Sequence, residues 1–292
     1  VVYGEGEMPL YKIIQKLKHT SPELDKSTMA GIFTRHTDRT QPARAAFAQL
    51  KGLNKLPVPD YDDYFNLLQT FKPHKRFFAT LPIETSRGCW WKRAVGSARV
   101  TGCAFCNLNL QWDGYRRKAA SQVAAEIDQL TNRHQTLSIA MMDNVLPRKA
   151  GIEIFRQIVK LKKDLRLFGE VRATTPLKEL EAMRACGMRE VQIGIEALSS
   201  GLLKKLRKGT SVIQNLEIMK NCEALGIRNI SNLILRFPGS NEQDVAETLR
   251  ALEFVLPLYP LKAVHFWLGL ESPVWQNPED YGIKAMFNHP YW

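Results

Sequence analysis

Three of the five cysteines in this sequence lie close together along the chain and form its clearest candidate for chemistry. Cys89 is followed by 13 residues, then by Cys103, and a Cys-x-x-Cys turn ends at Cys106. Such a turn lets two thiolates reach one metal centre, and a third thiolate from a preceding strand end can join them. Cys186 and Cys222 stand alone on predicted helices, so we expect both to be buried as small apolar side chains.

Three kinds of chemistry suit this cysteine trio to different degrees. Structural zinc prefers four N or S ligands in a tetrahedron, but no His lies between Cys89 and Cys106, and His134 lies beyond a predicted helix. A thioredoxin-type redox pair leaves Cys89 unexplained. A [4Fe-4S] cluster takes one protein ligand for each iron, so three thiolates leave one iron open to chelation by the amine and carboxylate of a small molecule. The cluster is the favoured interpretation, and zinc stays open.

The composition is that of an ordinary globular protein. The 292 residues are 45% hydrophobic and carry a net charge of +12, which allows one large domain with an appendage or two small ones. The apolar runs fall short of the roughly 18 residues that span a bilayer, so no membrane span is expected. The few, unevenly spaced cysteines favour a reducing cytoplasm. The sequence begins at Val1 without a leader, so we expect that upstream sequence is missing.

The excess of 41 Lys and Arg over 29 Asp and Glu is compatible with a polyanionic partner. A zinc-stabilised nucleic-acid-binding module is therefore kept as an alternative from another functional class. The basic residues are only modestly clustered, however, and a solvated surface explains them better. We therefore expect the basic stretch of Lys204, Lys205, Arg207 and Lys208 to lie on a solvated helix surface.

From about residue 78 the sequence alternates short apolar runs with amphipathic stretches, which is typical of βα units on a parallel sheet. The predicted strands are 80–84, 138–142, 166–171, 190–195, 229–235 and 262–268. Helical spacing of Val245, Leu249 and Leu256 predicts one of the amphipathic helices between them. Such repeats form an open doubly wound sheet or an incomplete barrel, and the period alone does not decide between them. In both folds the chemistry is expected at the carboxyl ends of the strands.

The cysteine segment resembles that of radical S-adenosylmethionine (SAM) enzymes, whose usual signature is Cys-x3-Cys-x2-Cys with an aromatic residue before the last Cys. Phe105 holds that aromatic position. Other stretches resemble the cobalamin-binding-domain group of these enzymes, and most closely the ribosomal-peptide (RiPP) maturation radical SAM proteins. They are residues 86–91 (Ser-Arg-Gly-Cys-Trp-Trp), 4–7 (Gly-Glu-Gly-Glu), 60–65, 192–196 and 208–209. The spacer of 13 residues in place of three departs from the usual pattern.

The resemblance implies an α/β fold, a partial (β/α)6 radical SAM barrel preceded by a small αβ remnant of a cobalamin-binding-like domain. Residues 1–77 would hold the remnant and a linker, and residues 78–292 the radical SAM core. Cys89, Cys103 and Cys106 would ligate the cluster. The implied SAM contacts are Phe105 beside the adenine, Met142, Asp143 and Asn144 near the amino group, Arg172 at the carboxylate, Glu196 at the ribose hydroxyls, and Arg236 after the fifth strand.

The activity implied by the resemblance is cleavage of SAM and modification of a peptide or small metabolite. C-methylation in natural-product maturation is the leading reaction, with cobalamin as a candidate cofactor. An alternative is transfer of the 3-amino-3-carboxypropyl group of SAM to a small acceptor, as in arsinothricin biosynthesis. The implied partners are the substrate and a one-electron donor such as flavodoxin or ferredoxin. Neither a membrane nor a nucleic acid is expected as a partner.

Overall fold

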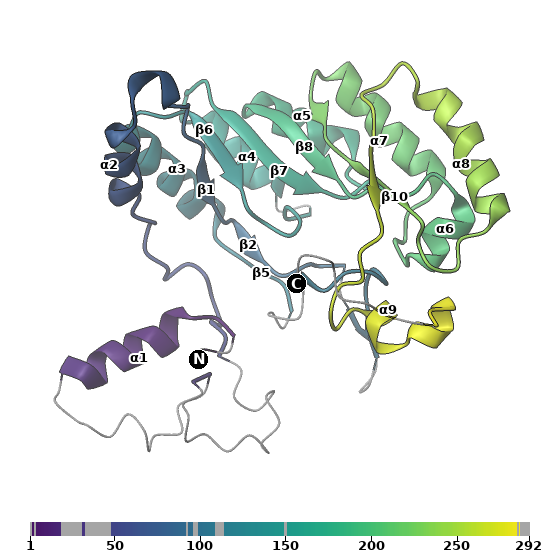
Figure 1. Cartoon of the computed structure of the whole chain (residues 1–292). Coiled ribbons are helices and arrows are strands. Elements are labelled where there is room, and N and C mark those ends of the chain that lie inside the picture. The colour runs from purple at the N-terminus through teal and green to yellow at the C-terminus, as the bar shows by residue number, and fades with distance from the viewer. Residues whose placement is uncertain are drawn as a thin grey trace.

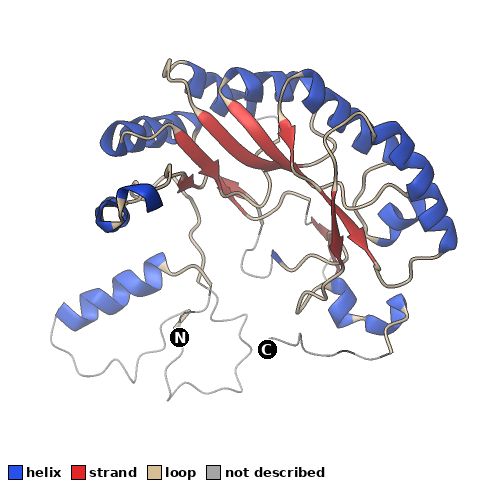
Figure 2. Cartoon of the chain, turned by 45° about the horizontal axis from the view of Figure 1, so that its top comes forward, coloured by secondary structure: helices blue, strands red, loops and turns tan. Residues whose placement is uncertain are grey.

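A curved parallel sheet with helices on its outer side forms most of the described chain (Figures 1 and 2). The computed structural model describes residues 2, 4–18, 31–32, 48–91, 93–95, 99–108, 114–148, 151–284 and 286, with the backbone alone for 93–95 and 99–101. Five parallel strands run in the order β1 (Leu81–Ile83), β6 (Ser138–Met141), β7 (Arg166–Val171), β8 (Met188–Ile193) and β9 (Arg228–Asn229). A second parallel pair consists of β10 (Asn232–Leu235) and β11 (Lys262–His265).

A bridge at Glu196 joins the two sheets into one strip. The Glu196 amide donates a hydrogen bond to the carbonyl oxygen of Asn232 (3.1 Å), and the Ile234 amide donates to the carbonyl oxygen of Glu196 (2.8 Å). The strip therefore continues from β8 through β10 to β11, and the sheet in Figure 2 curves without closing. The predicted α/β fold with a partial barrel is confirmed.

Helices alternate with the strands and cover one face of the sheet (Figure 2). They are α3 (Ala120–His134), α4 (Gly151–Val159), α5 (Leu177–Ala185), α6 (Ser200–Lys205), α7 (Val212–Ala224) and α8 (Glu242–Val255). Val123, Ile127 and Leu130 of α3 are buried in the same core cluster as Leu81 and Ile139 of the sheet. Burying each such side chain stabilises the fold by roughly 1.5–3 kcal/mol. The helices thus hold the strands in register from outside and leave the carboxyl ends of the strands for the site.

Helix α8 forms where the sequence predicts it, but its apolar stripe faces away from the core. Val245 and Leu249 are 55% and 60% exposed, whereas Asp244 is buried. The Asp244 carboxylate accepts hydrogen bonds from the Ser199 hydroxyl (2.9 Å) and from the Lys205 ammonium. Because these bonds need Asp244 on the inner side of the helix, they turn the apolar stripe outward.

Shorter elements lie before and after this sheet. They are α1 (Glu7–Lys18), α2 (Asp62–Thr70) and η3 (Pro73–Lys75) on the amino-terminal side, and α9 (Pro273–Gln276) and η5 (Pro278–Tyr281) near the other end. Residue 78 lies between η3 and β1, and the division into 1–77 and 78–292 stays a prediction. In the described residues, no helix has both the length and the apolar character that crossing a membrane requires.

The two isolated cysteines are buried, as predicted, and burial raises the pKa of each thiol to about 12. Cys186→Ala is expected to lower the free energy of unfolding by about 1 kcal/mol, because it leaves only a small cavity. The metal content of the purified protein should not change. Urea denaturation and metal analysis measure the two effects, and a loss of metal would contradict the assignment of Cys186 to the core.

Candidate active site

Two short strands within the long spacer between Cys89 and Cys103 pair in antiparallel fashion. They are β3 (Arg93–Val95) and β4 (Arg99–Thr101), and the pair is called the β3–β4 hairpin below. Opposite residues of an antiparallel pair have Cα atoms roughly 4.5–5.5 Å apart, so the chain returns close to the point where it left. The pairing therefore turns the end of the spacer back toward its start, so the 13 residues separate the two cysteines by less than an extended spacer would.

A second antiparallel pair closes the larger loop that contains the hairpin. Strand β2 (Ser86–Arg87) pairs with β5 (Arg116–Arg117). Gly88 follows β2 with a φ of 87°, and a Cβ at this position would lie 2.3 Å from the carbonyl oxygen of Gly114. Only glycine permits this approach. Residues 88–115, called the cysteine loop below, are thus held together at their base.

The Cys-x-x-Cys turn is anchored to two helices. The Ala104 amide donates a hydrogen bond to the carbonyl oxygen of Leu206, just after α6 (2.9 Å), and the Ala104 carbonyl accepts one from the Val274 amide of α9 (3.1 Å). The Cys106 amide donates to the carbonyl oxygen of Cys103 at 3.2 Å and closes the turn. These bonds fix the backbone from which two of the three predicted ligands project.

Cys106 lies within range of the charges of Cys103 and Cys89. The pKa of Cys106 is raised to about 11, first by burial and then by the Cys103 and Cys89 thiols, while Lys208 acts in the opposite direction. Within the described ranges, no three His, Cys, Asp or Glu side chains are gathered into a ready metal site. Three thiols in one loop are nevertheless the donor set that an iron–sulfur cluster takes, so the residues present fit that group.

Asp143, which follows β6, holds the turn that leads into the cysteine loop. Its carboxylate accepts hydrogen bonds from the Thr85 hydroxyl (2.9 Å), the Thr85 amide (3.2 Å) and the Ser86 hydroxyl (2.5 Å). Burial raises the pKa of Asp143 to about 6, although these bonds favour the charged form. Of its neighbours, Met142 is exposed, and the buried side-chain nitrogen of Asn144 has no hydrogen-bond partner among the residues that the structure describes.

Arg172, which follows β7, packs against both tryptophans of the cysteine loop. Its guanidinium carbon lies 4.2 Å from the ring centroid of Trp91 and 5.6 Å from that of Trp90. The guanidinium donates a hydrogen bond to the backbone carbonyl of Lys208, and its buried Nε has no hydrogen-bond partner in the described part of the chain. The two indole rings thus cover the guanidinium of Arg172, and its Nε–H is left available to donate a hydrogen bond to a ligand.

Lys208 is buried, which corrects the expectation that it lies on a solvated surface. Its side chain is 5% exposed, and its Nζ lies 3.5 Å from Oε1 of Glu196 and 5.7 Å from the centroid of the Phe105 ring. The reason is that α6 ends before this residue, and Arg207 takes a left-handed backbone conformation (φ 53°) that turns the chain inward. The other basic residues of this stretch are exposed or half-buried.

Two predicted contact residues, Glu196 and Arg236, have left-handed backbones where their strands end. Their φ angles are 61° and 57°. Such conformations cost on the order of 1–3 kcal/mol for residues other than glycine and often mark functional sites. At Glu196 the two hydrogen bonds of the bridge to β10 hold the strained backbone. The predicted contacts of both residues with SAM stay predictions.

Glu170 belongs to the same group of side chains and was not predicted from the sequence. Its pKa is raised to about 7 by burial and then by the charges of Glu196 and Asp143. Among the described residues its carboxylate has no hydrogen-bond or ion-pair partner. It lies on β7 two positions before Arg172, which directly follows the strand, so the extended backbone points both side chains to the same face of the sheet. The alternation of side chains along a strand is the sequence signal that could have identified Glu170, because it puts the residue two positions before Arg172 on the same face.

Charges of both signs therefore meet at the carboxyl edge of the sheet. This mixture complements a ligand that carries an ammonium and a carboxylate, as the methionine part of SAM does. The cations are Arg172 and Lys208, and the acids are Asp143, Glu170 and Glu196.

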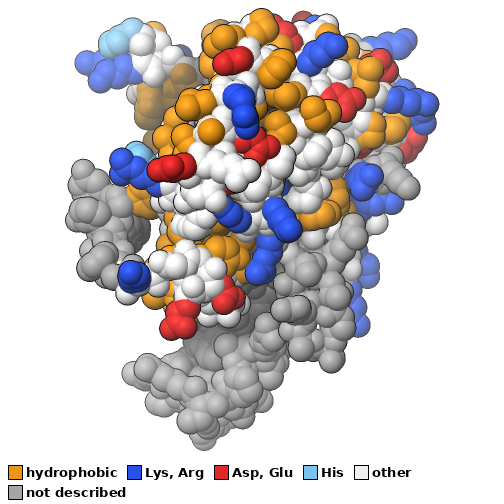
Figure 3. Space-filling model, turned by 90° about the vertical axis from the view of Figure 1, so that its right-hand side faces the viewer, with side chains coloured by type: hydrophobic (Ala, Val, Ile, Leu, Met, Phe, Trp, Pro, Cys, Tyr) orange, Lys and Arg blue, Asp and Glu red, His pale blue; other side chains and the backbone are white. Residues whose placement is uncertain are grey.

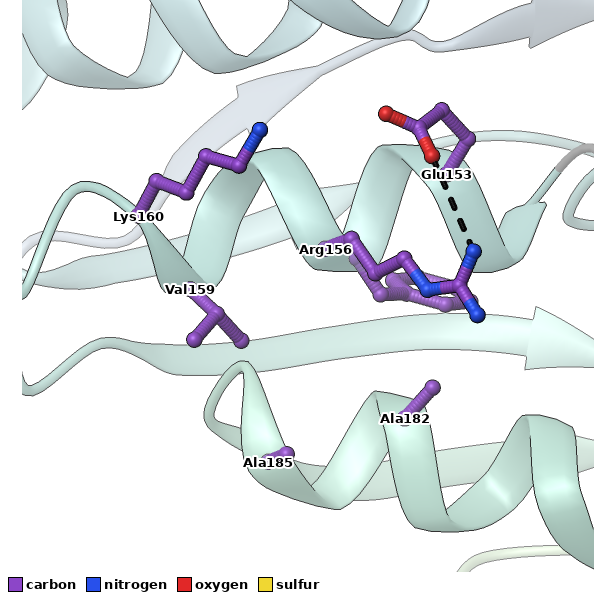
Figure 4. Close-up of a pocket in the computed structure, with 7 residues that line it drawn as sticks. Glu153, Arg156, Val159, Lys160, Ala182 and Ala185 are labelled. Carbon is purple, nitrogen blue, oxygen red and sulfur yellow. Dashed lines mark ion pairs between the residues drawn. The ribbon is translucent and has the colours of Figure 1, made fainter.

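A separate hollow of about 310 Å³ lies on the outer helical layer, between α4 and α5 (Figure 4). Glu153 and Arg156 form an ion pair on its rim at 3.9 Å, and both side chains are exposed. Val159, Ala182 and Ala185 line its apolar part. Because this hollow lies on the helices and not at the carboxyl ends of the strands, we assign it no role in the site.

The sequence matches the Radical SAM superfamily over residues 83–252, and this chain belongs to that superfamily. Enzymes of the family use a [4Fe-4S] cluster and SAM. The chain is 25% identical over 256 residues to an uncharacterized methyltransferase of Pyrococcus horikoshii, covering 86% of this chain and 51% of that protein. It is 24% identical over 256 residues to the anaerobic magnesium-protoporphyrin IX monomethyl ester cyclase of Rubrivivax gelatinosus, covering 85% and 43%. The chain thus spans about half the length of these relatives.

Two solved structures share the fold. The cobalamin-dependent SAM radical enzyme OxsB with aqua-cobalamin bound gives a TM-score of 0.68 at 21% identity, covering 95% of this chain and 39% of that one. The radical SAM methyltransferase TsrM from Kitasatospora setae, with cobalamin and a [4Fe-4S] cluster bound, gives 0.57 at 17% identity, covering 68% and 39%.

Asp143→Asn tests the buried charge beneath the cysteine loop. The folded-state pKa of about 6 lies above the ordinary value of 3.8, so the stability that Asp143 contributes at low pH is lost as the pH rises from about 4 to about 6. Asn keeps an oxygen for Thr85 and Ser86 but carries no charge. Relative to the wild type, the free energy of unfolding of the variant should therefore increase by roughly 2 kcal/mol between pH 4 and pH 7. Urea denaturation of the metal-free protein measures this difference, and a difference that stays constant over the pH range would contradict it.

Proposed function

We propose that this chain is the SAM-cleaving core of an enzyme that methylates a carbon atom of a peptide or small metabolite in natural-product maturation. The observation that carries the proposal is that the β3–β4 pair folds the 13-residue spacer back on itself, so that Cys89, Cys103 and Cys106 belong to one loop that is closed at its base by β2 and β5. The methyltransferase names of the Pyrococcus relative and of TsrM support the reaction class. A reducing cytoplasm suits thiols that must stay unpaired.

In this proposal the three cysteines hold the cluster and leave one iron open for SAM. When bound, the cluster supplies single electrons and SAM supplies the group that is transferred. The task of the protein is then to bind, orient and exclude water. Trp90 and Trp91 exclude water from one side of Arg172, since both indoles pack against its guanidinium.

The charged residues at the strand ends would orient SAM. Arg172 and Lys208 can bind its carboxylate, and a guanidinium does so with two parallel hydrogen bonds. Glu170 can accept a hydrogen bond from the ammonium, because its carboxylate is otherwise unpaired in the described residues. Asp143 is held by the turn before the cysteine loop and would act on the ammonium by charge. Glu196 is assigned to the ribose hydroxyls.

The proposal includes cobalamin as the methyl carrier. The structures of OxsB and TsrM with the same fold contain cobalamin, and residues 1–77 resemble the end of a cobalamin-binding domain. The alternative, transfer of the 3-amino-3-carboxypropyl group of SAM, differs in the carbon–sulfur bond that is broken. The nucleoside product therefore separates the two reactions.

Cys103→Ala is expected to abolish reductive cleavage of SAM, because two thiolates no longer hold the cluster in place. The fold should stay intact, since the neighbouring Ala104 keeps both backbone anchors. Anaerobic incubation with SAM and reductant, followed by mass spectrometry of 5′-deoxyadenosine, S-adenosylhomocysteine and methylthioadenosine, measures the loss and identifies the broken bond. Cleavage at the wild-type rate would refute the ligand assignment, and bound zinc without sulfide would refute the cluster.

We further propose that an acidic one-electron donor of the flavodoxin or ferredoxin class docks beside α6. A hollow of about 440 Å³ lies there, lined in part by Trp91, Gly102, Lys204 and Arg207. Gly102 directly precedes Cys103, so the hollow reaches the edge of the cysteine turn. Lys204 and Arg207 are exposed and have no ion-pair partner in the described residues. Figure 3 looks onto the side that carries α6 and α8, where several Lys and Arg side chains gather.

Reversing both charges in the double variant Lys204→Glu/Arg207→Glu should slow cluster reduction by flavodoxin hydroquinone on the order of tenfold or more at low salt. Reduction by dithionite should not change, because a small reductant needs no docking surface. The matched control is Arg156→Glu/Lys160→Glu, on α4 and directly after it, which reverses two exposed charges around the hollow of Figure 4. Stopped-flow absorbance follows the reduction. Equal rates with flavodoxin in both double variants would refute this docking site.

A further inference from the structure

The Gly-Glu-Gly-Glu stretch at residues 4–7 contacts the base of the cysteine loop, although it lies far from it in the sequence. The Glu5 side chain is 1% exposed, and its carboxylate accepts two hydrogen bonds from Arg116, at 2.5 and 3.1 Å. The same carboxylate lies 3.5 Å from Nη1 of Arg87. Glu7 accepts a further hydrogen bond from Arg87 at 2.5 Å. Two guanidinium groups thus share one buried carboxylate.

These two arginines occupy the strands that open and close the cysteine loop. Arg87 belongs to β2 and Arg116 to β5, and the two residues are direct partners in the antiparallel register. Two guanidinium groups side by side repel each other unless an anion lies between them. Glu84 accepts two hydrogen bonds from Arg87, both at 2.7 Å, but among the described contacts it does not reach Arg116. Glu5 supplies the anion that the two arginines share, so its charge favours the paired arrangement of the two strands.

The backbone holds Glu5 in place from its other side. The Glu5 amide donates a hydrogen bond to the carbonyl oxygen of Ala48 at 2.8 Å, and the Leu50 amide donates to the Glu5 carboxylate at 2.5 Å. Gly4 has a φ of 95°, and a Cβ there would lie 2.4 Å from the same Ala48 oxygen, so only glycine fits. Although burial opposes it, hydrogen bonds from Arg116 and Leu50 lower the pKa of Glu5, so the carboxylate is charged at neutral pH.

We propose that Glu5 is a positioning residue for the iron–sulfur cluster. By bridging Arg87 and Arg116 it clamps the two ends of the cysteine loop together and so fixes the relative positions of the three cysteines. The cluster part of this inference rests on the proposed function. The clamp itself rests only on the described contacts, and it gives the Gly-Glu-Gly-Glu stretch a role at a site more than 80 residues away.

The test uses Glu5→Gln, which keeps the size of the side chain and removes its charge. In the metal-free protein, amide hydrogen exchange over residues 84–90 and 114–119 should become faster on the order of tenfold, because the half-buried guanidinium groups of Arg87 and Arg116 lose the carboxylate that they share, although Arg87 keeps Glu7 and Glu84. In the reconstituted protein, iron release to a chelator should accelerate similarly, and the electron paramagnetic resonance spectrum of the reduced cluster should change.

Two control variants separate the clamp from general destabilisation. Glu153→Gln makes the same chemical change in the exposed ion pair on α4, and neither measurement should change. Ile218→Ala removes a core side chain of α7 and lowers the melting temperature without affecting the loop. Should Glu5→Gln not fold, Glu7→Gln removes the half-exposed outer contact of Arg87, and roughly a twofold effect on exchange is expected.

A folded Glu5→Gln protein with wild-type exchange over both segments would overturn the clamp. Faster exchange with unchanged iron release and an unchanged spectrum would overturn the positioning of the cluster. A wild-type protein that binds no cluster would refute the proposed function instead, and the exchange measurement on the metal-free protein would still decide whether Glu5 holds the loop.

Discussion

The closure of the cysteine loop on itself is the constraint on which the site depends. Two antiparallel pairs are nested, β2 with β5 at the base and β3 with β4 inside. Without the inner pair, the 13 residues between Cys89 and Cys103 would let the two thiols move independently. With the inner pair, the two ends of the spacer are brought toward each other, because the second strand of an antiparallel pair runs back along the first. An unusual spacing in the sequence is therefore compatible with one shared group of ligands.

Burial of charge is the second feature that shapes this edge of the sheet. Asp143 and Glu170 have raised pKa values because they lie away from water, and Lys208 is buried beside Glu196. Buried charges lower stability unless a partner or a ligand compensates them. Asp143 is compensated by hydroxyl and amide donors from the turn at the end of β1, whereas Glu170 has no such donor among the described residues. Asp143 therefore supports the loop, whereas the carboxylate of Glu170 is available to a ligand.

The scaffold places these groups with little freedom. Backbone bonds at Ala104 tie the Cys-x-x-Cys turn to α6 and α9, and the bridge at Glu196 ties β8 to β10. The strained backbone at Glu196 lies at that bridge, where hydrogen bonds on both sides offset its cost. Rigid elements thus surround the site on several sides, which favours a cofactor pocket that is preorganised before any ligand binds.

Local sequence patterns determined where most of the strands lie, the burial of Cys186, and the places of Arg172 and Glu196 at strand ends. Each of these follows from a short period, a nearest neighbour or a recognisable motif. The predicted strand 229–235 was wrong in one respect, because the structure divides it into β9 and β10, which belong to different sheets. The tertiary structure alone decided that α8 turns Val245 outward, that Lys208 is buried, and that Glu5 bridges two arginines. The physical reason is that these outcomes depend on partners such as Asp244, Glu196 and Arg116, and no periodicity encodes a contact between side chains as far apart as the 111 residues that separate Glu5 from Arg116.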